Sequence, residues 1–177
     1  MNITDGIINE AEFCPSPNFD NRSENSNIDL FVIHAISLPE GNYNTQLIKD
    51  LFLNDLDPGN DKFLQSIEHL KVSSHFLVTR SGSLIQFVPI HKRAWHAGKS
   101  NYQGRENCND FSIGIELEGT VNQEYEDIQY RKLKEIVDLL IKQYEIKHVV
   151  GHKDVAPNRK LDPGTKFDWG KILSAIW

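Results

Sequence analysis

The order of apolar and polar residues along the chain predicts a sheet with a buried central strand. Residues 30–36, LFVIHAI, are almost continuously apolar after the polar stretch 19–27, as in a strand covered on both faces. Residues 75–80 and 84–88 are β-prone runs joined by Ser-Gly-Ser, which indicates a hairpin. In residues 111–118 apolar side chains alternate with polar or small ones, so we expect one face in the core and the other outside it. A further short strand should end at Gly151.

Helical spacing of apolar residues predicts the covering layers. The segment from Thr45, TQLIKDLFL, favours a short helix capped by Asn44 or Thr45. Residues 124–144 carry the clearest apolar stripe, behind an acidic first turn, and Asp168 can cap a last helix ending near Trp177. We therefore expect one α/β domain over residues 1–177, with a central sheet covered by helices and a largely irregular N-terminal extension, residues 1–29.

Composition narrows the class of protein. A chain of 177 residues, 39% of them apolar, can bury a core as one domain. A net charge of −6 argues against nucleic acid as a partner and disfavours lasting contact with an anionic membrane surface. Two distant cysteines, Cys14 and Cys108, indicate free thiols in a reducing compartment.

The first twenty residues contain neither a basic leader nor an apolar run of signal-peptide length. No later segment approaches the roughly 20 apolar residues that span a bilayer. We therefore expect a cytoplasmic protein.

Three residues are candidates for holding a metal ion. His34 lies in the middle of an apolar strand, His152 follows the end of another, and Asp162 lies ten residues further on, in a loop rich in charged residues. Catalytic zinc takes three such ligands and leaves one position open. Each residue taken alone is better explained by an ordinary structural role. Asp154, two residues after His152, is a competing carboxylate that spacing does not exclude.

Four segments together resemble a known family. They are FVIHAISLPEG from Phe31, VSSHFLVTRSG from Val72, AWHAGKSNYQGRENCNDFSIGIELEGT from Ala94 and VVGHKDVAPNRKLDPGTKFDW from Val149. In order and spacing they resemble the zinc amidases that include phage T7 lysozyme and the peptidoglycan recognition proteins, and most of all the cytosolic members that recycle muropeptides. The resemblance implies a central mixed β-sheet flanked by helices, and one Zn²⁺ per chain.

The resemblance also implies roles for five residues. His34, His152 and Asp162 would bind zinc, Glu116 would transfer protons, and Lys160 would stabilise negative charge on the substrate oxygen. The alternation of residues 111–118 puts Glu116 on the polar face of its strand. Lys160 and Asp162 are two residues apart, so in an extended segment both side chains project the same way.

The predicted substrate contacts depend on the resemblance alone. Trp95 and His96 would line the cleft near the sugar, although a structural Trp is equally compatible with the composition. Where relatives carry arginines for the peptide carboxylates, this sequence has Lys71 and Asn107, and Arg105 remains. Lysine does not replace the bidentate guanidinium, so carboxylate binding should differ.

Other polar residues are assigned to structure or solvent. We expect His75 to be hydrogen-bonded at the start of the hairpin. The segment around Asp57 and Asp61 lacks the glycine and glutamate of a calcium loop, so we expect a solvated turn. Arg159 and the other unassigned charges of the C-terminal loop should be solvated.

The resulting hypothesis is a monomeric amidase that uses zinc to hydrolyse the bond between (1,6-anhydro-)N-acetylmuramic acid and L-alanine in small muropeptides. Two alternatives remain: a lysin that degrades the intact wall, and a peptidoglycan-binding module without activity.

Overall fold

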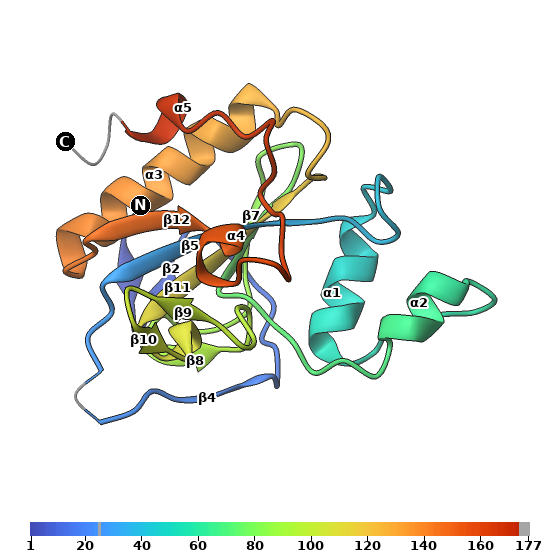
Figure 1. Ribbon diagram of the computed structural model, residues 1–177, viewed down its shortest axis with the longest axis horizontal. Helices are drawn as coiled ribbons and strands as arrows, with labels where there is room; N and C mark the ends of the chain where they lie inside the picture. Colours follow the sequence, from blue (N-terminus) through green and yellow to red (C-terminus); the bar gives the residue numbers. More distant parts are fainter. Residues whose placement is uncertain (25, 174–177) are drawn as a thin grey trace.

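The computed structural model describes residues 1–24 and 26–173 and contains a six-stranded central sheet (Figure 1). Its strand order is β12-β5-β11-β6-β7-β3. These strands are β3 (Glu12–Phe13), β5 (Leu30–Ile36), β6 (Phe76–Val78), β7 (Leu84–Gln86), β11 (Ser112–Glu118) and β12 (His148–Gly151). The predicted hairpin is present as the antiparallel pair β6 and β7.

The sheet is mixed, as expected. Strand β5 pairs in parallel with both β11 and β12, and β6 pairs in parallel with β11, whereas β7 runs antiparallel to β6. Parallel strands need crossover connections, and here these contain the helices that cover the sheet. The α/β fold class with a central mixed sheet is confirmed.

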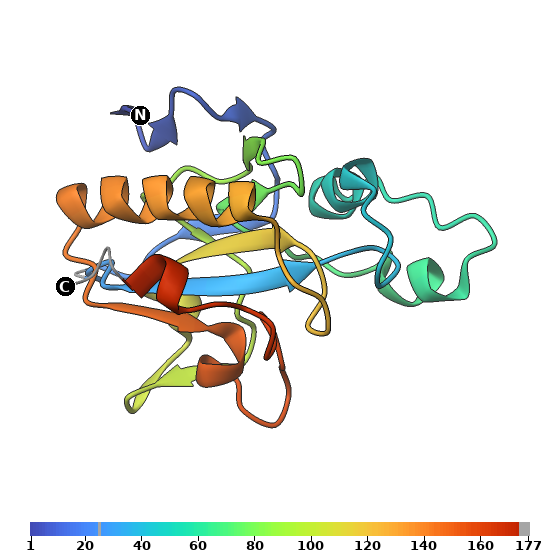
Figure 2. The same cartoon turned by 90° about the horizontal axis from the view of Figure 1, so that it is seen from above.

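One face of the sheet is buried against helix α3 (Asp127–Gln143), which lies along it in Figure 2. Odd-numbered residues of the central strands, such as Phe31 and Ile115, pack against Leu133, Ile136 and other apolar residues of the α3 stripe in the largest core cluster. Helix α5 (Gly170–Leu173) follows α3 on this face and adds Ile172. Among residues 1–24 and 26–173, no helix is both long and apolar enough to span a membrane.

The opposite face carries shorter elements. Helix α1 (Thr45–Leu53) has the bounds expected from its apolar spacing, and its cap is Asn44, whose side chain accepts from the Gln46 N–H. Helix α2 (Lys62–Ile67) was not predicted, and Asp61 caps it. Beyond these, η1 (Cys108–Asp110) precedes β11 and the one-turn helix α4 (His152–Val155) follows β12. The predicted end of the last helix, near Trp177, lies outside the described residues.

Strand β11 differs from its predicted environment, because all seven of its residues are buried. The polar side chains are enclosed by neighbouring segments or, at Glu116, line a pocket. Glu118, which we expected to be solvated, is buried and accepts hydrogen bonds from Thr45 Oγ1 (2.8 Å) and Arg80 N (2.9 Å). Alternation identified the two faces of β11 correctly, but only the tertiary structure shows that the polar face is enclosed.

The N-terminal extension contains four short strands joined by irregular segments. Strands β1 (Ile3–Thr4) and β2 (Ile7–Ile8) pair with each other, β3 adds to the edge of the sheet, and β4 (Phe19–Asn21) pairs with β8 (Lys92–Ala94). A further hairpin, β9 (Asn101–Tyr102) with β10 (Arg105–Glu106), lies near the C-terminal loop.

Arg22 ties this extension to the rest of the domain. Its guanidinium lies within 2.9–3.1 Å of four backbone carbonyl oxygens. They belong to Ile90, Asn109, Asp110 and Ser112. A charged donor shared among several otherwise buried carbonyls makes a strong local contact, since each carbonyl would lose its partner if the charge were removed.

We expect Arg22→Met to lower the free energy of unfolding by about 2–4 kcal/mol, because the four carbonyls then lack a donor. Urea unfolding followed by circular dichroism measures the change. Arg131→Met, at an exposed position on α3, is the control and should change stability little. Equal stability of the two variants would contradict this role of Arg22.

Candidate active site

Three neighbouring strands carry the candidate residues to one place. In the parallel pairing of β11 with β5, Glu116 lies opposite His34, on the face away from α3. On the other side of β5, Gly151 of β12 lies opposite Ile33, so the next residue, His152, reaches the level of His34. Residues 118 positions apart in the sequence are therefore adjacent at the carboxyl ends of parallel strands, a common location for sites in α/β proteins.

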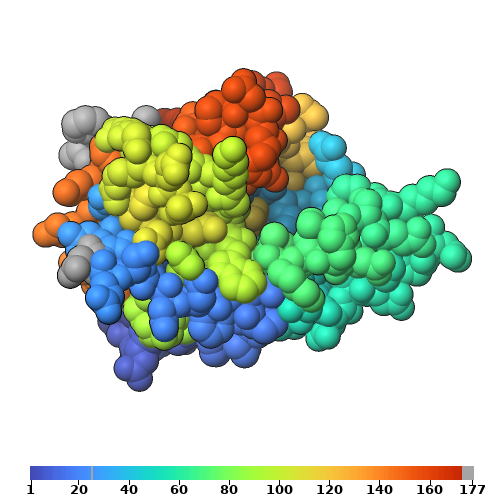
Figure 3. Space-filling model, turned by 60° about the horizontal axis from the view of Figure 1, so that its bottom comes forward, coloured from blue at the N-terminus to red at the C-terminus, as the bar shows by residue number. Residues whose placement is uncertain are grey.

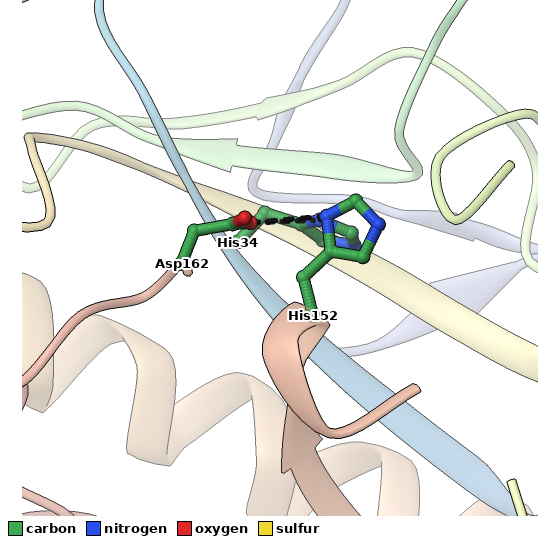
Figure 4. Close-up of side chains that lie close together, drawn as sticks. All are labelled: His34, His152 and Asp162. Carbon is green, nitrogen blue, oxygen red and sulfur yellow. Dashed lines mark hydrogen bonds and ion pairs between the residues drawn. The ribbon is translucent and has the colours of Figure 1, made fainter. Parts of the chain in front are cut away.

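His34, His152 and Asp162 form a compact triangle of potential ligand atoms (Figure 4). The two Nδ1 atoms are 2.9 Å apart, and Asp162 Oδ2 lies 3.3 Å from His34 Nδ1 and 3.1 Å from His152 Nδ1. Ligands at about 2.0–2.1 Å from a tetrahedral zinc are separated by about 3.3 Å. The triangle has dimensions suited to such an ion.

The chemistry of the three groups also fits a cation. Both imidazoles are buried, and burial, followed by the neighbouring His152, lowers the pKa of His34 to about 4. Although burial raises the pKa of the Asp162 carboxyl, the adjacent His152 and His34 rings outweigh it and hold the pKa well below its usual range. Two buried ring nitrogens and an ionised carboxylate thus converge on one point, an arrangement that a positive ion stabilises.

The competing carboxylate is directed elsewhere. Asp154 is exposed, and its Oδ2 accepts a hydrogen bond from the Gly151 N–H at 2.8 Å, at the start of α4. Its carboxylate is not among the three groups that converge in the described part of the chain. The structure therefore brings Asp162, and not Asp154, to the two histidines.

Packed contacts hold the loop that carries Asp162. Tyr125 donates a hydrogen bond to the Pro163 carbonyl at 2.7 Å. Gly164 has a φ of +92° and lies so close to the backbone of Val121 that a Cβ would clash with it. Arg159 is exposed, as expected, but it is also anchored, because its Nη2 donates to the carbonyls of Ala97 (2.5 Å) and Lys99 (2.9 Å).

Glu116 and Lys160 line the same pocket as the triangle, a cavity of about 210 Å³. Figure 3 shows a hollow between the orange-red C-terminal segment and the green segment that precedes β6. Glu116 is only 8% exposed, and its Oε2 has no hydrogen-bond partner among the described residues. Burial, followed by the Asp162 charge, raises the pKa of Glu116 well above its usual value, while Lys160 opposes this shift. Such a carboxyl is suited to exchange protons.

The family model described as N-acetylmuramoyl-L-alanine amidase matches residues 24–165 of the chain, which include the whole triangle and both neighbouring charged residues. The chain belongs to this amidase family. The resemblance found in the sequence is thereby confirmed.

Two comparisons extend over nearly the full length of this amidase. The chain is 46% identical over 178 residues to the 1,6-anhydro-N-acetylmuramyl-L-alanine amidase AmpD of Citrobacter freundii, covering 99% of this chain and 95% of that protein. A crystal structure of a selenomethionine derivative of AmpD superposes with a TM-score of 0.96 at 46% identity, covering 100% of both chains.

A more distant solved structure contains a ligand. It is the amidase AmiD of Escherichia coli in complex with the substrate anhydro-N-acetylmuramic acid-L-Ala-D-γ-Glu-L-Lys. The two proteins are 30% identical and superpose with a TM-score of 0.62, over 88% of this chain and 60% of that one.

The residues predicted to contact substrate are not all at the pocket of this amidase. Trp95 and His96 line it, together with Leu70 and Ser73, which no sequence pattern had indicated. Lys71, the residue after Leu70, is exposed but does not line the pocket. Arg105 lies elsewhere, since it pairs with Asp29 at 2.7 Å and stacks over the Phe111 ring at 3.7 Å. Arg105 does not line this pocket, but its side chain is 47% exposed, so its contact with substrate stays a prediction.

His75 and the acidic turn have structural roles, as expected. The His75 ring is fully buried; its Nδ1 accepts from the Gly114 N–H at 3.1 Å, so its Nε2 carries the proton and donates to the Lys92 carbonyl at 3.1 Å. In the acidic turn, Asp57 accepts from the Gly59 N–H and Asp61 caps α2.

Acid should destabilise the metal-free amidase partly through His75. Burial, followed by the Arg22 charge, lowers its pKa from 6.5 to about 3. Between these values the unfolded chain binds a proton that the folded chain does not, so this contribution to stability is complete above about pH 6.5 and falls as the pH decreases. His75→Asn keeps an acceptor for Gly114 and removes the titration.

From about pH 6.5 to 4.5 the unmodified protein should therefore lose about 2 kcal/mol more stability than the His75→Asn variant. Urea unfolding at several pH values, with a chelator present, measures both slopes. Parallel slopes would contradict a neutral buried His75.

Proposed function

We propose that this amidase uses one Zn²⁺, held by His34, His152 and Asp162, to hydrolyse the bond between 1,6-anhydro-N-acetylmuramic acid and L-alanine in soluble muropeptides. The observation that carries this proposal is the triangle of buried ligand atoms in a chain that matches AmpD over almost its full length. Such fragments arise during peptidoglycan turnover, so the activity belongs to recycling. Cytoplasmic location and a monomeric state remain predictions from the sequence.

Glu116 is placed to move the proton in this reaction. When bound, zinc would lower the pKa of a water ligand toward about 7 and polarise the amide carbonyl. Glu116 shares the pocket with the three ligands, and its free Oε2 can accept the proton of the attacking water. Because burial favours its protonated form, the same carboxyl can hold that proton and pass it to the leaving amine of L-alanine.

Lys160 is placed to stabilise charge on the substrate. As the amide carbon becomes tetrahedral, negative charge develops on its oxygen. The Lys160 ammonium lines the pocket two residues before Asp162, so it lies on the same wall as that ligand. Its charge also opposes the rise in the pKa of Glu116, which helps that carboxyl to ionise before each turnover.

Two variants should separate metal binding from proton transfer. We expect Asp162→Ala to lose zinc at neutral pH, because the two imidazoles alone leave the ion without its anionic ligand. Glu116→Gln should retain zinc and lose turnover by about 10²–10⁴-fold, since an amide cannot accept the proton. Metal analysis after dialysis and product release by chromatography measure both. Full zinc occupancy in Asp162→Ala would point to another ligand.

The substrate can be tested by direct comparison. Purified anhydro-muramyl tripeptide and intact sacculi are supplied at equal concentrations of amide bond, and release of L-alanine-linked peptide is followed. We expect cleavage of the soluble fragment to be faster by about tenfold or more, because a pocket of about 210 Å³ receives a chain end more readily than a cross-linked polymer. Preference for sacculi would favour a lysin, and binding of the fragment without cleavage would favour a binding module.

A further inference from the structure

Each imidazole of the triangle has its second ring nitrogen engaged by a single two-residue segment, His96–Ala97. His34 Nε2 lies 2.9 Å from His96 Nδ1, and His152 Nε2 lies 3.2 Å from the Ala97 carbonyl oxygen. The segment immediately follows Trp95, and the resemblance in sequence predicted that Trp95 and His96 line the cleft near the sugar. A neutral imidazole presents a lone pair on one nitrogen and a proton on the other, so these contacts bear on which nitrogen faces the metal position.

The direction of the hydrogen bonds that start at His34 is set by a backbone carbonyl. Ser112 Oγ lies 2.5 Å from the Cys108 carbonyl oxygen, and only Ser112 can supply the proton between these two oxygens. With its proton used there, Ser112 Oγ must accept from His96 Nε2, 3.1 Å away. His96 Nδ1 is then an acceptor, so His34 donates from Nε2 and leaves its Nδ1 lone pair directed at Asp162 and His152.

A single hydrogen bond sets the tautomer of His152. A carbonyl oxygen only accepts, so the contact with Ala97 requires the proton on His152 Nε2. In the neutral ring Nδ1 then carries the lone pair and faces Asp162 Oδ2 at 3.1 Å, a pairing that a cation between them stabilises. The Ala97 oxygen also accepts from Arg159 Nη2, which anchors the carbonyl through a second donor. In both rings the proton is held on Nε2, because hydrogen bonds that start there end at a main-chain carbonyl. Both rings therefore present Nδ1 to the metal position.

The segment is itself held in place. Asn109 Oδ1 accepts from the backbone N–H groups of His96 (3.1 Å) and Ala97 (2.7 Å). The His96 ring packs directly over Gly114 of β11, at a distance that leaves no space for a Cβ. His96 is also buried, and both of its ring nitrogens are engaged. It offers no free polar atom to a sugar, and its contacts are those of a rigid support.

We propose that the His96–Ala97 segment is the positioning element of the metal centre: the hydrogen bonds from Cys108 through Ser112 and His96 set the tautomer of His34, and the Ala97 carbonyl sets that of His152. This inference rests on the metal centre proposed above. It gives His96 a role in orienting a ligand in place of the predicted contact with the sugar.

The tautomers can be measured without metal, so this test does not depend on zinc binding. Long-range ¹H–¹⁵N correlation spectra of the metal-free protein at neutral pH distinguish a proton on Nδ1 from one on Nε2. We expect His34 and His152 to carry theirs on Nε2. In Ser112→Ala, His96 loses the acceptor for its Nε2 proton, and His34 should populate the Nδ1-protonated form.

Replacement of His96 separates positioning from packing. The side-chain oxygen introduced by His96→Asn occupies the place of the imidazole Nδ1 and keeps an acceptor for His34, whereas His96→Leu fills similar space without one. We expect zinc affinity, measured by competition with a chromogenic chelator, to fall about 10–100-fold in His96→Leu and about tenfold in Ser112→Ala. His96→Asn should stay within about threefold of the unmodified protein, because a preserved hydrogen bond to the ligand preserves affinity. His69→Leu, at an exposed position, is the control and should change nothing.

The proposal is overturned if metal-free His34 carries its proton on Nδ1, or if Ser112→Ala leaves the His34 tautomer unchanged. It is equally overturned if His96→Asn loses as much zinc affinity as His96→Leu, since packing alone would then explain the loss. If His96→Leu fails to fold, the His34 tautomer in Ser112→Ala and the zinc affinity of His96→Asn still test the proposal. If His34 and His152 carry their protons on Nε2 but the protein never binds zinc, the proposed metal centre is refuted and the assignment of the hydrogen bonds is retained.

Discussion

The parallel registration of β12, β5 and β11 is the constraint on which the rest of the site depends. It aligns His34 of β5 with Glu116 of β11 and with the end of β12, which His152 follows directly. Side chains in a sheet alternate between faces, so a shift of one residue in either pairing would turn a ligand toward α3 and into the apolar core. The large core on the α3 face therefore fixes the geometry of the polar face as well as stabilising the domain.

A site built in this way is electrostatically costly. Two imidazoles, a carboxylate and a second carboxyl are enclosed together, and burial raises the pKa of Glu116 while it lowers that of His34. The same enclosure strengthens any interaction with a cation or with a developing charge. Groups that would be destabilising in a core can therefore bind a cation or stabilise a developing charge at the carboxyl ends of the strands. A pocket opens there, and a loop from outside the sheet brings Asp162 to it.

Distant segments are linked through the backbone around Ser112. Arg22 of the N-terminal extension donates to the Ser112 carbonyl at 2.9 Å, and the Ser112 hydroxyl connects Cys108 to His96. The extension thus contacts the residues that hold the proposed zinc ligands in place, without lining the pocket. A change in the extension can therefore reach the ligands through hydrogen bonds that begin outside the site.

The sequence by itself determined the strands β5, β6, β7, β11 and β12, the long helix, the fold class and, through the resemblance, the five residues that converge at the pocket. Those follow from local periodicity and from motifs whose spacing is visible in one dimension. Spacing alone left Asp154 open, and the structure agrees with the resemblance in bringing Asp162 to the two histidines. Tertiary structure alone showed that the polar face of β11 is enclosed, that Arg105 does not line the pocket and that His96 lies behind His34. Each of these depends on which atoms meet across strands and loops far apart in the chain, and no local pattern of apolar and polar residues encodes such contacts.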